Sequence, residues 1–308
     1  MKVSLVRSQG FSEDAIKRAV FEALDSIEPS FSPIPVSVLI KLNLCYYWDY
    51  STGETSDPRV ISALIDYIRE RVNERADIAL GDTDASAMKT KHAFRMLGFE
   101  KLAQDKNVRL VNLSTENVKE RETVVGRKPF KLLVSDLLMD TDLVVNAAKL
   151  KYHRTPKMTC AMKNIFGAIG KPRKFVYHKK ILHETIVAIN KIVKPDINLV
   201  DGIIAVGKHP KKMGVLLASE DRVSVDFVAS RILGYKPKSI KYLRLAKKEK
   251  LGPIGPIELI EKHTTLKETR KAFPKVNNLI QRLAWGFQIS GVKLYAKIMG
   301  DIVPPMIE

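Results

Sequence analysis

Lysine, histidine and asparagine side chains interrupt an otherwise apolar part of the sequence between residues 149 and 167. They are Lys149, Lys151, His153, Lys163 and Asn164. A lysine that is removed from water, or that lies beside another cation, has a lowered pKa and can act as a base or a nucleophile. Histidine can transfer protons near neutral pH, and an asparagine amide can donate hydrogen bonds to an oxyanion or a phosphate. An ordinary solvated strand end followed by a turn would show the same Lys-x-Lys-x-His spacing.

The segment after His153 has the signals of a helix start. Thr155 is a suitable N-cap and Pro156 is favoured at the first helical position, which predicts a helix from there through Ile165. A helix N-terminus presents free backbone N–H groups and a partial positive charge, which suits a phosphate or carboxylate. We therefore expect Arg154 and Thr155 to bind an anion, together with the polar side chains around them.

Polar residues also follow other predicted strands. Lys41 and Asn43 end the strand predicted over 36–44, and Asp82 and Asp84 follow the strand over 76–81, while Asp201 follows the strand over 198–200. The carboxyl ends of parallel strands meet at one edge of a sheet, where ligands bind. We expect Lys41 and Asn43 to bind the anion, and Asp82 and Asp201 to act as general acid, general base or metal ligand. Asp82 and Asp84 are equally suited to cap the helix that follows them.

The elements that position these residues alternate along the chain. Strand-like segments at 2–7, 36–44, 76–81, 108–113 and 142–148 are separated by helical patterns at 12–24, 58–68 and 89–97. This alternation predicts an α/β fold, with a mostly parallel sheet and helices on both of its faces. Residues 1–260 are expected to form the α/β domain. Residues 261–308 are expected to form a basic, amphipathic, C-terminal helical extension that can support a homodimer.

Several of these short motifs occur together in one known family. They are Lys41-Leu-Asn43, Gly81-Asp82, the run from Lys149 to His153, Lys163-Asn164-Ile-Phe-Gly167, Asp201-Gly202 and Val225-Asp226. Over about residues 36–255 the sequence resembles the domain of unknown function 362 family. Many members also carry a ferredoxin-like iron–sulfur module. This chain has two cysteines, Cys45 and Cys160, so we expect no iron–sulfur cluster from this chain alone.

A more distant similarity is to the N-terminal domain of the lactate racemase family, whose members attach a nickel-pincer nucleotide to a lysine. This similarity would place His153 near a catalytic histidine and Lys163 near the cofactor-bearing lysine. The glycine-rich stretch that normally precedes that lysine is missing here. We therefore expect the location of the pocket to be shared, rather than the cofactor, and leave the cofactor open, a divalent metal included.

The formal net charge of +18 attracts polyanions. It suits a small anionic ligand, a nucleic acid or simply a soluble surface. The nucleic-acid alternative rests on two basic segments. The first contains Lys171, Arg173, Lys174, Lys179 and Lys180, and the second is the lysine-rich stretch 236–250.

The sequence therefore predicts an enzyme or ligand-binding protein that acts on a small phosphorylated or carboxylated metabolite. No run of about 18 uncharged apolar residues is present, so we expect no transmembrane segment. The N-terminus does not read as a secretory signal, and we expect a cytoplasmic protein.

Overall fold

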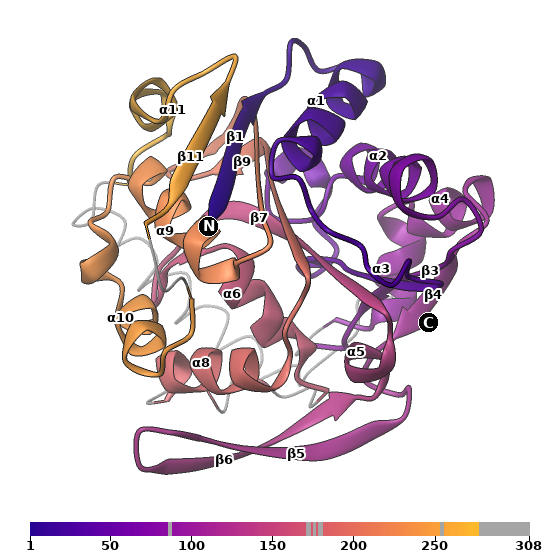
Figure 1. Ribbon diagram of the computed structural model, residues 1–308, viewed down its shortest axis with the longest axis vertical. Helices are drawn as coiled ribbons and strands as arrows, with labels where there is room; N and C mark the ends of the chain where they lie inside the picture. The colour runs from indigo at the N-terminus through magenta and orange to yellow at the C-terminus, as the bar shows by residue number, and fades with distance from the viewer. Residues whose placement is uncertain (86–87, 171–173, 175–176, 178–180, 253–255, 277–308) are drawn as a thin grey trace, which may run out of the picture.

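A nine-stranded sheet forms the centre of the protein, whose computed structural model describes residues 1–85, 88–170, 174, 177, 181–252 and 256–276 (Figure 1). Eight strands lie in the order β11-β1-β10-β9-β7-β2-β3-β4, and β8 pairs with the end of β7. Their bounds are β1 (Lys2–Arg7), β2 (Ser37–Lys41), β3 (Asp77–Asp82), β4 (Arg109–Asn112), β7 (Leu143–His153), β8 (Lys157–Thr159), β9 (Ile197–Val206), β10 (Pro210–Ser219) and β11 (Glu258–Lys262). All pairings are parallel except those of β10 and β8. This confirms the predicted α/β fold with a mostly parallel sheet.

Helices cover both faces of the sheet, and each face has its own hydrophobic core. The α-helices are α1 (Glu13–Asp25), α2 (Pro58–Tyr67), α3 (Thr90–Met96), α4 (Phe99–Asp105), α5 (Leu137–Asp140), α6 (Ala161–Ile165), α8 (Leu182–Ile192), α9 (Arg222–Ile232), α10 (Lys241–Lys248) and α11 (Leu266–Ala272). One core contains Ile40 and Val145 with the apolar sides of α1 and α2. The other contains Leu39 and Val144 with those of α6, α8 and α9. Alternate residues of one strand enter opposite cores because side chains point to alternate faces.

Local capping explains why two of the predicted helices begin where they do. The Ser12 hydroxyl accepts a hydrogen bond from the backbone N–H of Ala15 and caps α1. The Asp57 carboxylate accepts from the backbone N–H of Arg59, with Pro58 at the first position of α2. Both features satisfy N–H groups that the first helical turn leaves free. The predicted starts of these helices are therefore confirmed.

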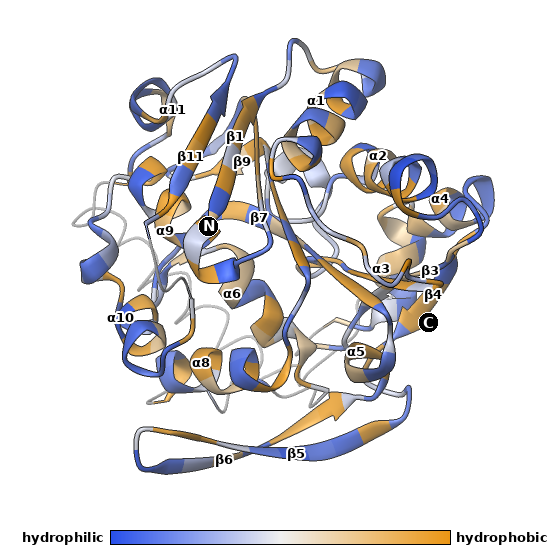
Figure 2. Ribbon diagram, in the orientation of Figure 1, coloured by the Kyte–Doolittle hydropathy of each residue, from blue (hydrophilic) through white to orange (hydrophobic). Residues whose placement is uncertain are grey.

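The hairpin formed by β5 (Val118–Val125) and β6 (Lys128–Ser135) lies apart from the central sheet. Its strands carry many hydrophilic residues, whereas β7 and β9 are mostly hydrophobic (Figure 2). Buried side chains alternate along β6, where Phe130, Leu132 and Val134 enter the core on the α8 side. No strand is predicted here from the sequence, because the charged outward residues hide this alternation.

Two predicted elements are wrong in ways that affect the site. The helix predicted from Thr155 begins only at Ala161, because β7 continues to His153 and folds back as β8. The strand predicted over 198–200 extends over Ile197–Val206, which puts Asp201 inside β9 rather than after it.

The carboxyl-terminal part of the described chain returns to the sheet. β11 pairs in parallel with β1 and crosses residue 260, the predicted limit of the α/β domain. α11 packs against α9. The predicted helical extension continues through residues 277–308, which lie outside the described residues.

Candidate functional site

Two lysine–aspartate pairs lie at the carboxyl edge of the sheet. Nζ of Lys41, at the end of β2, is 2.6 Å from Oδ1 of Asp82, at the end of the neighbouring strand β3. Nζ of Lys149, on β7, is 2.8 Å from Oδ2 of Asp201, its register partner on β9. All four residues are buried. The structure thus joins four residues that the sequence analysis selected separately.

The two aspartates are held by further donors. Asp82 also accepts hydrogen bonds from the backbone N–H groups of Leu44 and Thr83. Asp201 accepts from the N–H groups of Asp57 and Ile203. Burial nevertheless raises the pKa of Asp201, against the effect of the Lys149 ammonium. These contacts make both pairs part of the supporting framework of the edge.

Lys151 is paired with a residue that the sequence analysis did not select. Its Nζ donates to the backbone carbonyl of Glu54 at 2.6 Å and lies 2.9 Å from the Glu54 carboxylate. Burial opposes the charge of Lys151, but the Cys45 thiol and the Glu54 carboxylate outweigh it and raise the pKa of this lysine. Glu54 lies in an irregular loop 97 residues away in sequence, and no motif or periodicity marks it.

Lys163, on α6, lacks such a partner. Its side chain is partly buried and its Nζ lies 4.2 Å from the centroid of the Phe166 ring. Within the described ranges, no carboxylate or hydrogen-bond acceptor contacts this ammonium group. Burial, followed by the nearby Lys151 charge, lowers the pKa of Lys163 to about 7. In a substantial fraction of the molecules, the Lys163 amine is therefore neutral and nucleophilic at physiological pH.

Lys174 enters the same edge from the basic segment that follows α6. Its Nζ donates to Oγ1 of Thr83 and, at 3.0 Å, to the carbonyl of Gly167. Both acceptors are uncharged. Burial lowers the pKa of Lys174 to about 7, and the charges of Lys41 and Lys163 act in the same direction. Lys171, Arg173, Lys179 and Lys180, the other members of the basic segment, lie outside the described residues.

Gly167 allows the chain after α6 to pass over the Lys41–Asp82 pair. A Cβ atom at this position would lie 3.2 Å from Nζ of Lys41 and 3.8 Å from Oδ1 of Asp82. The first separation is tighter than ordinary packing. This close approach gives a physical reason for glycine at the end of the Lys163-Asn164-Ile-Phe-Gly167 motif.

Asn164 is buried, and its side-chain amide donates hydrogen bonds to groups of the protein itself. Its Nδ2 donates to Oδ1 of Asn146 at 2.8 Å and to the carbonyls of Leu42 and Ala147, both at 3.3 Å. Asn146 in turn donates to Asn198 on β9 at 2.9 Å. This buried amide chain fixes α6, and with it Lys163, over the strand ends. The sequence analysis did not select Asn146 or Asn198, because both lie within apolar strands.

Asn43 is likewise hydrogen-bonded to other groups of the protein. Its Nδ2 donates to the carbonyl of Glu54 at 3.2 Å, and its backbone N–H donates to Oγ of Ser56. It therefore holds the loop that brings Glu54 to Lys151.

The predicted helix N-terminus at Thr155 is replaced by a hairpin turn. His153 ends β7, Arg154 and Thr155 are exposed in the turn, and the N–H of Thr155 donates to Nδ1 of His153 at 3.1 Å. Two signals favoured a helix locally, but the backbone groups of this segment are instead satisfied by pairing of β7 with β8.

The actual N-terminus of α6 lies against Asp226. The Met162 N–H is 3.4 Å from Oδ2 of this fully buried carboxyl, which also accepts from the Tyr242 hydroxyl at 3.0 Å. Burial raises the pKa of Asp226 to about 7. Tyr242 and the start of α6 are therefore the partners of the Asp226 carboxyl.

Asp84 caps the start of α3. Oδ1 accepts from the backbone N–H and the hydroxyl of Thr90, both at 2.9 Å, and Oδ2 lies 3.2 Å from Nζ of Lys89. Burial opposes this charge, but the Thr90 and Lys89 contacts outweigh it and lower the pKa of Asp84. The structure thus shows Asp84 in the helix-capping role that the sequence allowed. Among the residues described, no three His, Cys, Asp or Glu side chains are grouped to hold a metal ion.

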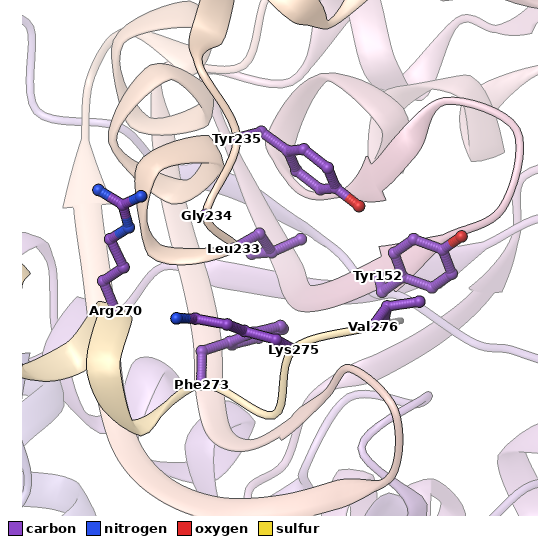
Figure 3. A pocket seen from close by; sticks show the side chains of 8 residues that line it. All are labelled: Tyr152, Leu233, Gly234, Tyr235, Arg270, Phe273, Lys275 and Val276. Atoms are coloured by element: carbon purple, nitrogen blue, oxygen red, sulfur yellow. The ribbon is translucent and has the colours of Figure 1, made fainter. Parts of the chain in front are cut away.

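A cavity of about 220 Å³ lies between the end of β7, the end of α9 and the chain around α11 (Figure 3). Its lining is Tyr152, Leu233, Gly234, Tyr235, Arg270, Phe273, Lys275 and Val276. Tyr152 alternates along β7 with Lys151 and His153, so its side chain lies on the opposite face of the strand from theirs. None of the predicted site residues lines this cavity.

The fold and site define an α/β protein with a cluster of buried lysines at the carboxyl edge of a mostly parallel sheet. The chain belongs to the family described as Domain of unknown function (DUF362), whose model matches residues 38–231. Among curated proteins it is similar to a thylakoid-associated protein of Synechocystis sp., with 34% identity over 133 residues. That alignment covers 39% of this chain and 41% of the relative, so the similarity spans less than half of either protein.

Two solved structures are similar at low identity. The lactate racemase apoprotein from Thermoanaerobacterium thermosaccharolyticum aligns with a TM-score of 0.45 and 12% identity, over 75% of this chain and 56% of that one. A protein from Thermotoga maritima aligns with a TM-score of 0.40 and 13% identity, over 67% of this chain and 54% of that one.

None of the described helices has the length and apolar character needed to cross a membrane. The cytoplasmic location and the homodimer stay predictions.

Proposed function

We propose that the protein binds a small anionic metabolite at the carboxyl edge of the sheet, with Lys163 as the residue that contacts the ligand and acts as base or nucleophile. The observation that carries this proposal is the contrast among the buried lysines. Lys41, Lys149 and Lys151 each have a carboxylate partner, whereas Lys163 has none among the described residues.

An unpartnered ammonium group in a protein interior is costly, because burial removes it from water. The neighbouring lysines add repulsion. A phosphate or carboxylate bound beside Lys163 would relieve both effects. Ligand binding therefore removes the unfavourable free energy that the unpaired Lys163 ammonium contributes to the free protein.

The pKa of about 7 gives Lys163 a second use. Near neutral pH the amine can accept a proton from a bound substrate or attack an electrophilic carbon. His153 lies two residues beyond Lys151 on β7, and we assign it proton transfer at the mouth of the site. Lys41, Lys149, Asp82 and Asp201 then serve as supports, since they are paired with each other.

Nucleic-acid binding stays an alternative prediction. It rests on the basic segments 171–180 and 236–250, and Lys174, the member of the first set that the structure describes, is buried against Thr83. Loss of affinity with rising salt would be the signature of that function.

Binding of inorganic phosphate and of acetate to the full chain, measured by calorimetry, tests the proposal. We expect Lys163→Met to weaken binding by about 100-fold, because charge-assisted contacts contribute up to about 3 kcal/mol. Lys101→Met removes the same charge from an exposed position on α4 and should leave binding unchanged. The proposal fails if neither anion binds the wild type, or if both variants bind as well as it does.

A further inference from the structure

The charges at the lysine cluster do not balance. Asp82, Asp201 and Glu54 are each taken by one lysine, and Asp84 pairs with Lys89. Lys163 and Lys174 remain, and in the described part of the chain neither makes an ion pair. When both are protonated, Lys163 and Lys174 therefore carry two positive charges that no carboxylate among the described residues pairs with.

The local sequence offers nothing to neutralise them. No aspartate or glutamate occurs between Asp142 and Glu184, a stretch that contains the whole of β7, α6 and the basic segment 171–180. The acids that do reach the cluster come from β3, β9 and the Glu54 loop, and they are already paired.

The two ammonium groups belong to one small region. Nζ of Lys163 lies over the Phe166 ring, and Nζ of Lys174 bonds the carbonyl of the next residue, Gly167. The two side chains thus approach the same turn of chain after α6. Their charges are close enough for Lys163 to lower the pKa of Lys174.

We propose that the ligand group held between Lys163 and Lys174 is a compact dianion of the phosphate-monoester type. The inference rests on the proposed function and narrows its ligand class. A single carboxylate would balance one ammonium and leave the other buried without a counter-charge. A phosphate monoester carries close to two charges at pH 7 and has oxygens for both lysines.

Binding of a dianion should also take up protons. In the free protein both lysines titrate at about pH 7. A bound dianion favours the charged form of each lysine and raises both pKa values. At pH 8, each of the two lysines is neutral in most of the free protein molecules. Binding of one dianion should therefore take up close to two protons per protein molecule.

Calorimetry of the full chain with sulfate, acetate and nitrate at fixed ionic strength tests the inference. Sulfate stays a dianion between pH 6 and 9, so that proton uptake belongs to the protein. We expect sulfate to bind at least about tenfold more tightly than either monoanion, which corresponds to one additional charge-assisted contact. At pH 8, the binding enthalpies measured in Tris and in HEPES should differ by the number of protons taken up multiplied by the difference between the ionisation enthalpies of the two buffers.

Two variants at each lysine separate charge from structure. Lys163→Met and Lys174→Met each leave one lysine at the site. In either variant, the affinity for sulfate should exceed that for acetate or nitrate by less than about threefold. Lys163→Arg keeps its charge at all these pH values, so it should retain the preference and lower the proton uptake by about one. Lys101→Met should match the wild type.

The outcomes distinguish the two proposals. If none of the three anions binds, the proposed function falls. If acetate binds as tightly as sulfate, or if binding takes up no protons, the function stands and the dianion inference is overturned. Tighter binding of malonate than of sulfate would overturn the compact phosphate-like group.

Discussion

The lysines of the strands and the lysines around α6 lie at the same edge of the sheet but differ in their partners. Lys41, Lys149 and Lys151 project from β2 and β7 and meet carboxylates within 2.6–2.9 Å. Lys163 and Lys174 meet an aromatic ring, a hydroxyl and a backbone carbonyl. The first group forms a supporting layer with balanced charge. The second leaves positive charge available to a ligand, at a cost to the free protein.

The largest expected effect comes from breaking a pair in the supporting layer. Asp201→Ala leaves Lys149 buried without its carboxylate and should lower the free energy of unfolding by about 3–5 kcal/mol, as urea denaturation would measure. Asp105→Ala removes an exposed carboxylate from α4 and should change it by less than about 0.5 kcal/mol. A cost below about 1 kcal/mol for Asp201→Ala would show that the two lysine groups do not differ in this way.

Replacing Lys163, which has no carboxylate partner among the described residues, should raise the free energy of unfolding rather than lower it. The folded-state pKa of Lys163, about 7, lies below its unfolded value of about 10.5. The unfolded chain therefore binds more protons between these values, and the destabilisation is fully present below about pH 7 and fades as pH rises toward 10.5. Lys163→Met should stabilise the ligand-free protein by about 1–3 kcal/mol at pH 6 and clearly less at pH 9.5.

Urea denaturation at both pH values measures this difference, with Lys101→Met as the control for a lost surface charge. An equal gain at pH 6 and pH 9.5 would mean that the added apolar contact, rather than the removed charge, stabilises the variant.

Gly167 connects the two groups, since the chain passes over Lys41 at this point. Gly167→Ala should cost about 1–2 kcal/mol, because the new methyl group would meet Nζ of Lys41 at 3.2 Å. The cost should largely vanish when Lys41 is replaced by Ala, which a double-mutant cycle would detect as coupling. Independent effects of the two substitutions would argue against this contact.

The smallest effect is expected where the sequence favoured a helix start. Thr155 lies in an exposed turn, so Thr155→Ala should change stability by less than about 0.5 kcal/mol. Thr265 caps α11 through Oγ1, which accepts from the Glu268 N–H at 3.2 Å, and Thr265→Ala should cost about 1 kcal/mol. Equal costs for the two threonines would support a capping role for Thr155 after all.

The sequence by itself determined the α/β class, the starts of α1 and α2, and the ends of β2 and β3 at which Lys41 and Asp82 lie. These features depend on local periodicity and on residues within one helical turn. The tertiary structure decided which lysines are paired, because the pairs join positions 41, 52 and 97 residues apart. It also decided against the helix at Thr155, since pairing between β7 and β8 outweighed a local capping signal. The excess of two lysines around α6 is a property of the folded edge, where, among the residues that the structure describes, five lysines meet and three find carboxylates.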